Sequence, residues 1–116
     1  MHEAGIAAEI LEIAKTQAAE HGHMRVSEVA VRLGEMSGVV AEALEFAFEA
    51  LRDGAAEGAR IEIKRIPVLA RCEACRVESR PGADLVLWCA QCGRPMKVLE
   101  GEELTVESVV LEDGDQ

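Results

Sequence analysis

Hydrophobic positions near the start of the chain recur at intervals of three and four residues. This spacing predicts an amphipathic helix that ends at Gly22, a residue suited to a left-handed helix cap. A second segment with the same period follows Ser37, a candidate N-cap, and stops at Asp53 and Gly54. The two predicted apolar stripes are Ile6, Ala7, Ile10, Leu11, Ala14 and Ala18, and then Val40, Leu44, Ala47, Phe48 and Leu51.

Two other segments, residues 28–33 and 60–64, alternate apolar and polar residues, which is the period of a half-buried strand. Residues 104–111 predict a third strand of the same sheet. Pro67 prevents the second strand from continuing as an unbroken ladder, because proline lacks the N–H that a ladder needs. A short apolar run at residues 85–88 predicts one more strand, as part of a hairpin.

Four cysteines stand between the second and third of these strands. Cys72 and Cys75 form one C-x₂-C pair, and Cys89 and Cys92 form another after thirteen intervening residues. Two such pairs can bring four sulfurs to the corners of a tetrahedron, so the spacing predicts a structural zinc site. Gly93 follows the second pair, where a tight turn needs positive φ. Two disulfides, or an iron site on the same four ligands, are the alternatives.

The order of these segments predicts an α+β fold, with two helices packed on a small three-stranded sheet and an inserted zinc-ribbon module. We expect residues 1–67 plus 100–116 to form the α+β domain. Residues 68–99 would form the zinc-binding module. A chain of 116 residues is long enough for one domain with a small appendage of this kind.

The charge of the chain bears on its partners and its location. A net charge of −10 argues against nucleic-acid binding, because phosphate contacts need a basic surface. From Arg60 to Lys97, however, the local balance is +4, which zinc and four thiolates would lower to about +2. This contrast indicates either an ordinary charged surface or a face for an acidic protein partner. No apolar run has membrane-spanning length and no signal sequence begins the chain, so we expect a cytoplasmic protein without a membrane partner.

No motif in the chain indicates an enzyme. The serines lack a nucleophile-elbow context, and no glycine-rich phosphate loop opens either predicted helix. A site of four cysteines leaves no coordination position open, so its zinc would be structural rather than catalytic.

The three histidines differ in their setting. His21 and His23 flank the predicted helix end and have the character of surface loop residues. His2 stands beside the amine of Met1 and the amide of Glu3, and these nitrogens can close adjacent chelate rings on one ion. Such a nitrogen-rich, nearly square-planar set suits Ni²⁺ or Cu²⁺. Against this, a histidine at a chain terminus often has no metal role, since termini are commonly disordered.

Taken together, several motifs resemble the HypA/HybF hydrogenase nickel-incorporation proteins. The resemblance covers essentially the whole chain, in order and without a large gap. It is carried by Met1-His2-Glu3 at the start of a helix, residues 34–39 leading into 43–49, residues 56–63 before a strand, the two C-x₂-C pairs, and Gly101-Glu102-Glu103-Leu104 before the last strand.

The resemblance implies a nickel metallochaperone rather than an enzyme. It implies that Ni²⁺ binds at the N-terminus through His2 and the backbone around it, Met1 included, with a contribution from Glu3. It implies structural zinc on the four cysteines and transfer of nickel toward the large subunit of [NiFe]-hydrogenase, with a HypB-type GTPase as partner. Some relatives also serve urease maturation, so urease accessory proteins are further expected partners.

One alternative function and one alternative assembly remain open from sequence. The chain could be a zinc-ribbon module for protein interaction or nucleic-acid binding in which His2 has no nickel role, although the overall acidity counts against nucleic acid. A surface of this size could also support a homodimer.

Overall fold

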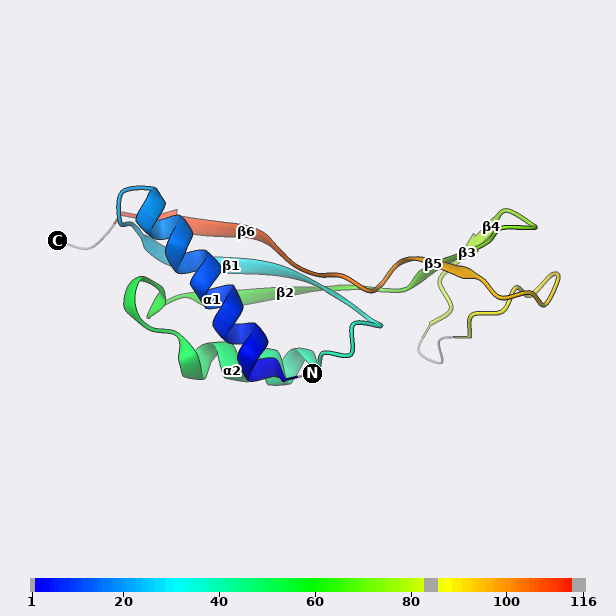
Figure 1. Cartoon of the computed structure of the whole chain (residues 1–116), viewed down its shortest axis with the longest axis horizontal. Coiled ribbons are helices and arrows are strands. Elements are labelled where there is room, and N and C mark those ends of the chain that lie inside the picture. The colour runs from blue at the N-terminus through cyan, green and yellow to red at the C-terminus, as the bar shows by residue number, and fades with distance from the viewer. Residues whose placement is uncertain (1, 83–85, 114–116) are drawn as a thin grey trace.

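The computed structural model describes residues 2–82 and 86–113. The molecule is elongated, with extents of 63 × 24 × 15 Å, and two small sheets lie at its two ends (Figure 1). Two of the positions discussed above, Met1 and Leu85, lie outside the described residues. In the part of the chain that the structure describes, no helix is long and apolar enough to cross a membrane.

The two helices form where the apolar spacing predicts them. α1 spans Glu3–Glu20 and α2 spans Ala41–Leu51. Alanine supplies much of the buried stripe of α1, which lets the helix approach its neighbours closely. The buried residues are Ala7, Ile10, Leu11, Ala14 and Ala18 in α1, and Ala41, Leu44 and Phe48 in α2.

The predicted start of α2 is wrong by several residues. Val40, not Ser37, is the N-cap of α2, and the Ser37 hydroxyl instead accepts a hydrogen bond from the Val39 N–H at 3.2 Å. Serine readily bonds to a backbone group two residues away, and this local turn competes with capping. Two residues assigned to the apolar stripe are also exposed. Val40 precedes the first turn and Leu51 ends the last, so neither faces the core.

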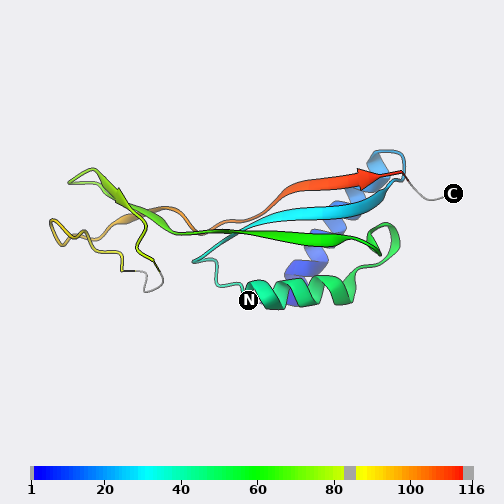
Figure 2. The same cartoon turned by 180° about the vertical axis from the view of Figure 1, so that it is seen from behind.

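The first sheet has the strand order β2-β1-β6. β1 spans Arg25–Gly34 and pairs in parallel with β2, Arg60–Ile66. β6 spans Leu104–Glu112 and pairs antiparallel with β1. Both helices pack against this sheet, and Figure 2 shows the strands in front of α1. The α+β fold with two helices on a three-stranded sheet is therefore confirmed.

The core of the molecule lies between these helices and this sheet. The inward residues Val29 and Val31 of β1 are fully buried beside Leu44 and Phe48 of α2. On the outer face of the sheet, Glu107 of β6 pairs with Lys64 at 2.6 Å and Arg32 at 3.8 Å. That face is therefore a charged, solvent-facing surface.

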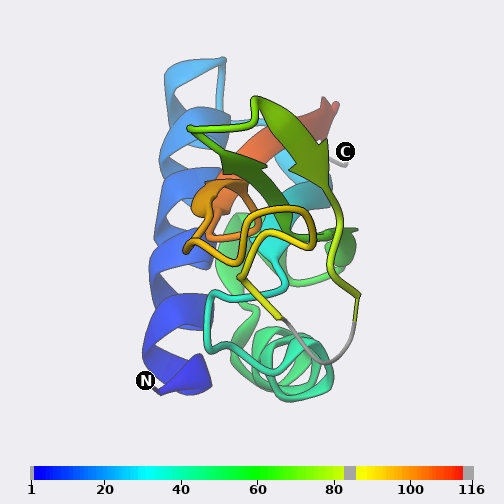
Figure 3. The same ribbon diagram turned by 90° about the vertical axis from the view of Figure 1, so that its right-hand side faces the viewer.

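A second, smaller sheet has the order β4-β3-β5. Its strands are β3, Leu69–Cys72, β4, Val77–Ser79, and β5, Lys97–Glu100. Figure 3 looks along the molecule with this sheet in front of the first. The proposed division into residues 1–67 plus 100–116 and residues 68–99 stays a prediction, since the two sheets alone do not establish independent units.

The strand predicted at residues 85–88 is wrong for its described part. Val86 and Leu87 lie outside any strand, and Trp88 makes only an isolated bridge to Pro95. Val86 and Trp88 are 50% and 59% exposed, so these apolar side chains are not buried against a sheet. The Met96 N–H bonds to the Leu87 carbonyl at 2.8 Å, which folds the chain back around the second cysteine pair instead of extending a ladder.

The two sheets are joined by two neighbouring segments, which the loop after β1 ties together. The Gly34 N–H bonds to the Glu103 carbonyl at 2.7 Å, and the Met36 N–H bonds to the Gly101 carbonyl at 2.6 Å. Glu35 binds the other segment, through its N–H to the Ile66 carbonyl at 2.9 Å. We call residues 34–40, which begin with the last residue of β1, the hinge loop.

Gly34→Ala should destabilise the chain. A Cβ at residue 34 would lie 2.2 Å from the Gly101 carbonyl carbon and oxygen, so one backbone segment must move. Overpacking of this kind costs about 1–3 kcal/mol. Gly5→Ala is the matched control, because Gly5 lies in α1 with nothing within 4 Å of its added Cβ. That change should stabilise by about 0.5–1 kcal/mol. Urea unfolding measures both, and a neutral Gly34→Ala would contradict the close contact.

Candidate metal centres

The structure brings the four cysteine thiols together. Their sulfur atoms all lie within 4.8 Å of one another. The Cys72 and Cys92 sulfurs are 3.6 Å apart, and the Cys75 and Cys89 sulfurs are 3.9 Å apart. Tetrahedral zinc with Zn–S bonds of about 2.3 Å would separate its sulfurs by about 3.8 Å. All four cysteines are free rather than paired in disulfides, so the donor set fits one tetrahedral metal ion.

Each cysteine pair is held by the same kind of turn. In the first pair, the Arg76 N–H bonds to the Cys72 carbonyl at 2.7 Å. In the second pair, the Gly93 N–H bonds to the Cys89 carbonyl at 2.8 Å. The residue after each pair has positive φ, 60° at Arg76 and 74° at Gly93. The positive φ expected at Gly93 is thus confirmed, whereas nothing in the sequence indicates a positive φ at Arg76.

The protein environment gives two of the thiols different pKa values. The N–H groups of Cys92 and Gln91 lower the pKa of the Cys89 thiol to about 7, since they stabilise its thiolate. The neighbouring Cys92 thiol and burial raise the pKa of Cys75 to about 12. A metal ion must therefore displace protons to bind here, so its affinity falls as the pH falls.

The N-terminal candidate ligands lie at the start of α1. His2 is exposed and is the N-cap of α1, and its carbonyl accepts the Ile6 N–H at 3.2 Å. Met1 lies outside the described residues. Helical backbone therefore begins directly after His2, and α1 anchors the short arm that carries the imidazole.

The side chain of Glu3 turns toward α2. Its Oε2 accepts a hydrogen bond from the Val40 N–H at 3.2 Å. That bond is the main reason that the pKa of Glu3 lies below its usual range, followed by a bond from the N–H of Glu3 itself. The sequence did not reveal this contact, because no local pattern relates residues 3 and 40.

The other two histidines have a different setting. His21 Nδ1 lies 2.8 Å from the Gln17 carbonyl, and His23 has a φ of 59° in the turn after α1. Within residues 2–82 and 86–113, the cysteines form the one group of three or more histidine, cysteine or acidic residues arranged to hold a metal. The described part of the chain therefore gathers no further ligands around His21 or His23.

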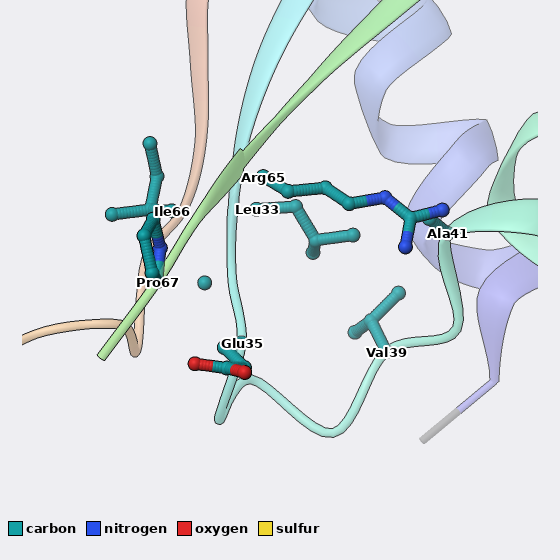
Figure 4. Close-up of a pocket in the computed structure, with 8 residues that line it drawn as sticks. Leu33, Glu35, Val39, Ala41, Arg65, Ile66 and Pro67 are labelled. Carbon is teal, nitrogen blue, oxygen red and sulfur yellow. The ribbon is translucent and has the colours of Figure 1, made fainter. Parts of the chain in front are cut away.

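A pocket of about 320 Å³ opens between the hinge loop and the ends of β1 and β2 (Figure 4). Its charged side chains already have partners. Glu35 Oε1 accepts the Val68 N–H at 3.0 Å, and Arg65 donates to Glu42 at 2.9 Å. The first contact ties the hinge loop to the segment between β2 and β3, and the second ties β2 to α2. The pocket is lined by Leu33, Gly34, Glu35, Val39, Ala41, Arg65, Ile66 and Pro67.

The fold and the sites define a small two-sheet protein in which a helix-covered α+β unit is joined to a four-cysteine metal-binding module. A family model described as hydrogenase/urease nickel incorporation, metallochaperone, hypA, matches residues 1–111. The chain belongs to this HypA family, and the resemblance inferred from its motifs is confirmed.

Individual relatives match the sequence of this chain over nearly its full length. The chain is 40% identical over 113 residues to a hydrogenase maturation factor HypA from Nitrosospira multiformis, with 96% of this chain and 97% of the relative covered. It is also 40% identical to the HypA of Geobacter metallireducens over 114 residues, covering 97% of this chain and all of the relative.

Solved structures agree in fold. A solution structure of HypA protein superimposes with a TM-score of 0.72 at 22% identity, covering 97% of each chain. The solution structure of the Ni metallochaperone HypA from Helicobacter pylori gives a TM-score of 0.66 at 22% identity, covering 96% of this chain and 97% of the other. At this identity the two structures support the fold.

Proposed function

We propose that this chain is a nickel metallochaperone that binds Ni²⁺ at its N-terminus and delivers it during maturation of [NiFe]-hydrogenase. The observation that carries the proposal is the match to the nickel-incorporation family from residue 1 to residue 111. That match includes the N-terminal arm as well as the four-cysteine module, so it is not a likeness of the zinc ribbon alone.

Nickel would bind to nitrogen atoms of the first three residues. The set comprises the amine of Met1, the amides of His2 and Glu3, and the His2 ring. Ni²⁺ favours such a nitrogen-rich set in a nearly square-planar arrangement. The exposed position of His2 at the first residue before α1 supports the proposal, because an ion that is to be handed on must be reached by its recipient.

Zinc would be held by Cys72, Cys75, Cys89 and Cys92. Four thiolates complete a tetrahedral site and leave no position for substrate or water, so this zinc would be structural. It would fix the second sheet, since Cys72 ends β3. The second cysteine pair would be brought to the same ion from outside any strand.

The partners follow from the same family membership. Hydrogenase-maturation proteins are the expected class, and we propose a HypB-type GTPase, the hydrogenase large subunit and urease accessory proteins within it. Free thiols suit a reducing compartment, so we place the transfer in the cytoplasm.

Metal analysis of the purified, untagged chain tests this proposal. We expect one zinc per chain as isolated and one nickel more after Ni²⁺ addition, with zinc retained, because the two sites use different donors. Mass spectrometry under native conditions counts each metal. Zinc without nickel uptake would favour the zinc-ribbon interaction module, and red, iron-loaded protein would overturn the zinc assignment.

A further inference from the structure

The contact between Glu3 and Val40 joins the starts of the two helices. Glu3 is the first residue of α1, and Val40 is the N-cap of α2. Val40 has an apolar side chain and makes no N-cap bond, but its own N–H donates to the Glu3 carboxylate at 3.2 Å. This is the bond that a capping box takes from the third residue of the same helix, and here a residue of α1 accepts it. The Glu3 carboxylate therefore lies at the N-terminal ends of both helices.

The electrostatics of this position favour an ionised carboxylate. Both helices present their positive ends to the Glu3 side chain, which stabilises negative charge there. Glu3 is partly exposed, and its hydrogen bond to the Val40 N–H lies at the surface of the molecule.

We propose that Glu3 is a positioning residue of the nickel site and that its carboxylate is not a nickel ligand. The carboxylate fastens the first residue of α1 to the start of α2 and so fixes the arm that carries His2. This inference rests on the proposed nickel function. A fixed arm loses less conformational freedom when it closes around an ion, which is how preorganisation strengthens binding.

Three variants separate positioning from ligation. Glu3→Ala removes the acceptor, whereas Glu3→Gln removes the charge but keeps an oxygen that can accept the Val40 N–H. Val40→Pro removes the donor and leaves all candidate ligands in place. The φ of Val40, −85°, is close to the range that proline adopts. Glu9→Ala, which removes an exposed carboxylate elsewhere on α1, is the matched control.

Nickel titration calorimetry and the visible absorption spectrum of the bound nickel are the two measurements. We expect about tenfold weaker binding for Glu3→Ala and Val40→Pro, equivalent to about 1.4 kcal/mol. A chain that carries both Glu3→Ala and Val40→Pro should bind nickel no more weakly than either single variant, because both substitutions remove the same contact. Glu3→Gln should stay within about threefold of the native chain. All variants should keep the native nickel spectrum, because the ligand atoms are unchanged.

Two results would overturn the inference. A changed nickel spectrum in both Glu3→Gln and Glu3→Ala would make the carboxylate a ligand. If the Glu3→Ala chain bound nickel with native affinity, Glu3 would have no positioning role, whatever the nickel affinity of the Val40→Pro chain. Failure of the proposed nickel function would be recognised separately, because the native chain itself would then bind no nickel. Circular dichroism checks that each variant retains its helices.

Discussion

Replacing Cys75 with alanine is expected to remove zinc from the chain and to unfold the four-cysteine module while the α+β unit stays folded. The module has little else to hold it. Its three strands contain three or four residues each, and β4 is exposed throughout. Among the described residues, the buried core cluster lies between Ala7 and Ala59, and the module buries only Val68 and Ala70 besides two of its cysteines. Binding of a structural zinc contributes about 10–16 kcal/mol to small zinc-finger peptides, far more than these strands can supply.

Zinc content by mass spectrometry and amide hydrogen exchange measure this result. Zinc should fall from one per chain to near zero, and exchange should become fast in β3, β4 and β5 but not in β1. Glu73→Ala is the control, because it changes an exposed residue between Cys72 and Cys75 and leaves all four thiols in place. Full zinc stoichiometry in the Cys75→Ala chain would contradict the assigned ligands.

Periodicity predicted most of the fold because burial and secondary structure agree along α1, α2 and the first sheet. Apolar residues that are exposed do not follow this rule. Val86 and Trp88 have the composition of a strand, yet tight turns around the cysteine pair decide their conformation. The start of α2 was misplaced for a related reason. Ser37 uses its hydroxyl in a local turn, and the carboxylate that meets the start of α2 belongs to a different helix.

The two candidate metal centres differ in how far sequence could define them. Cysteine spacing alone was sufficient to predict a four-thiol cluster, because two short turns set most of its geometry. The contact between Glu3 and Val40 depends on the packing of α1 against α2, which no spacing between the two residues reveals. His2 was singled out by its place in the chain and by the family resemblance rather than by any cluster of ligands.

Replacing His2 with alanine is expected to abolish nickel binding while leaving the fold and the zinc content unchanged. Loss of a group that only orients a ligand typically weakens metal binding about 10–100-fold, and loss of the imidazole ligand itself should exceed that. The fold should tolerate the change, because His2 is exposed and its carbonyl, not its side chain, bonds to α1. Residues added before Met1 should weaken the same site by converting its amine into an amide.

Calorimetric titration of Ni²⁺ into the zinc-loaded His2→Ala chain is the most direct test of nickel binding at the N-terminal arm. The native chain and a His21→Ala, His23→Ala double variant are the controls, because these two histidines lie in the turn at the opposite end of α1. We expect one nickel per chain in both controls and no measurable binding in His2→Ala. Undiminished nickel binding in His2→Ala would contradict a nickel site at the N-terminal arm.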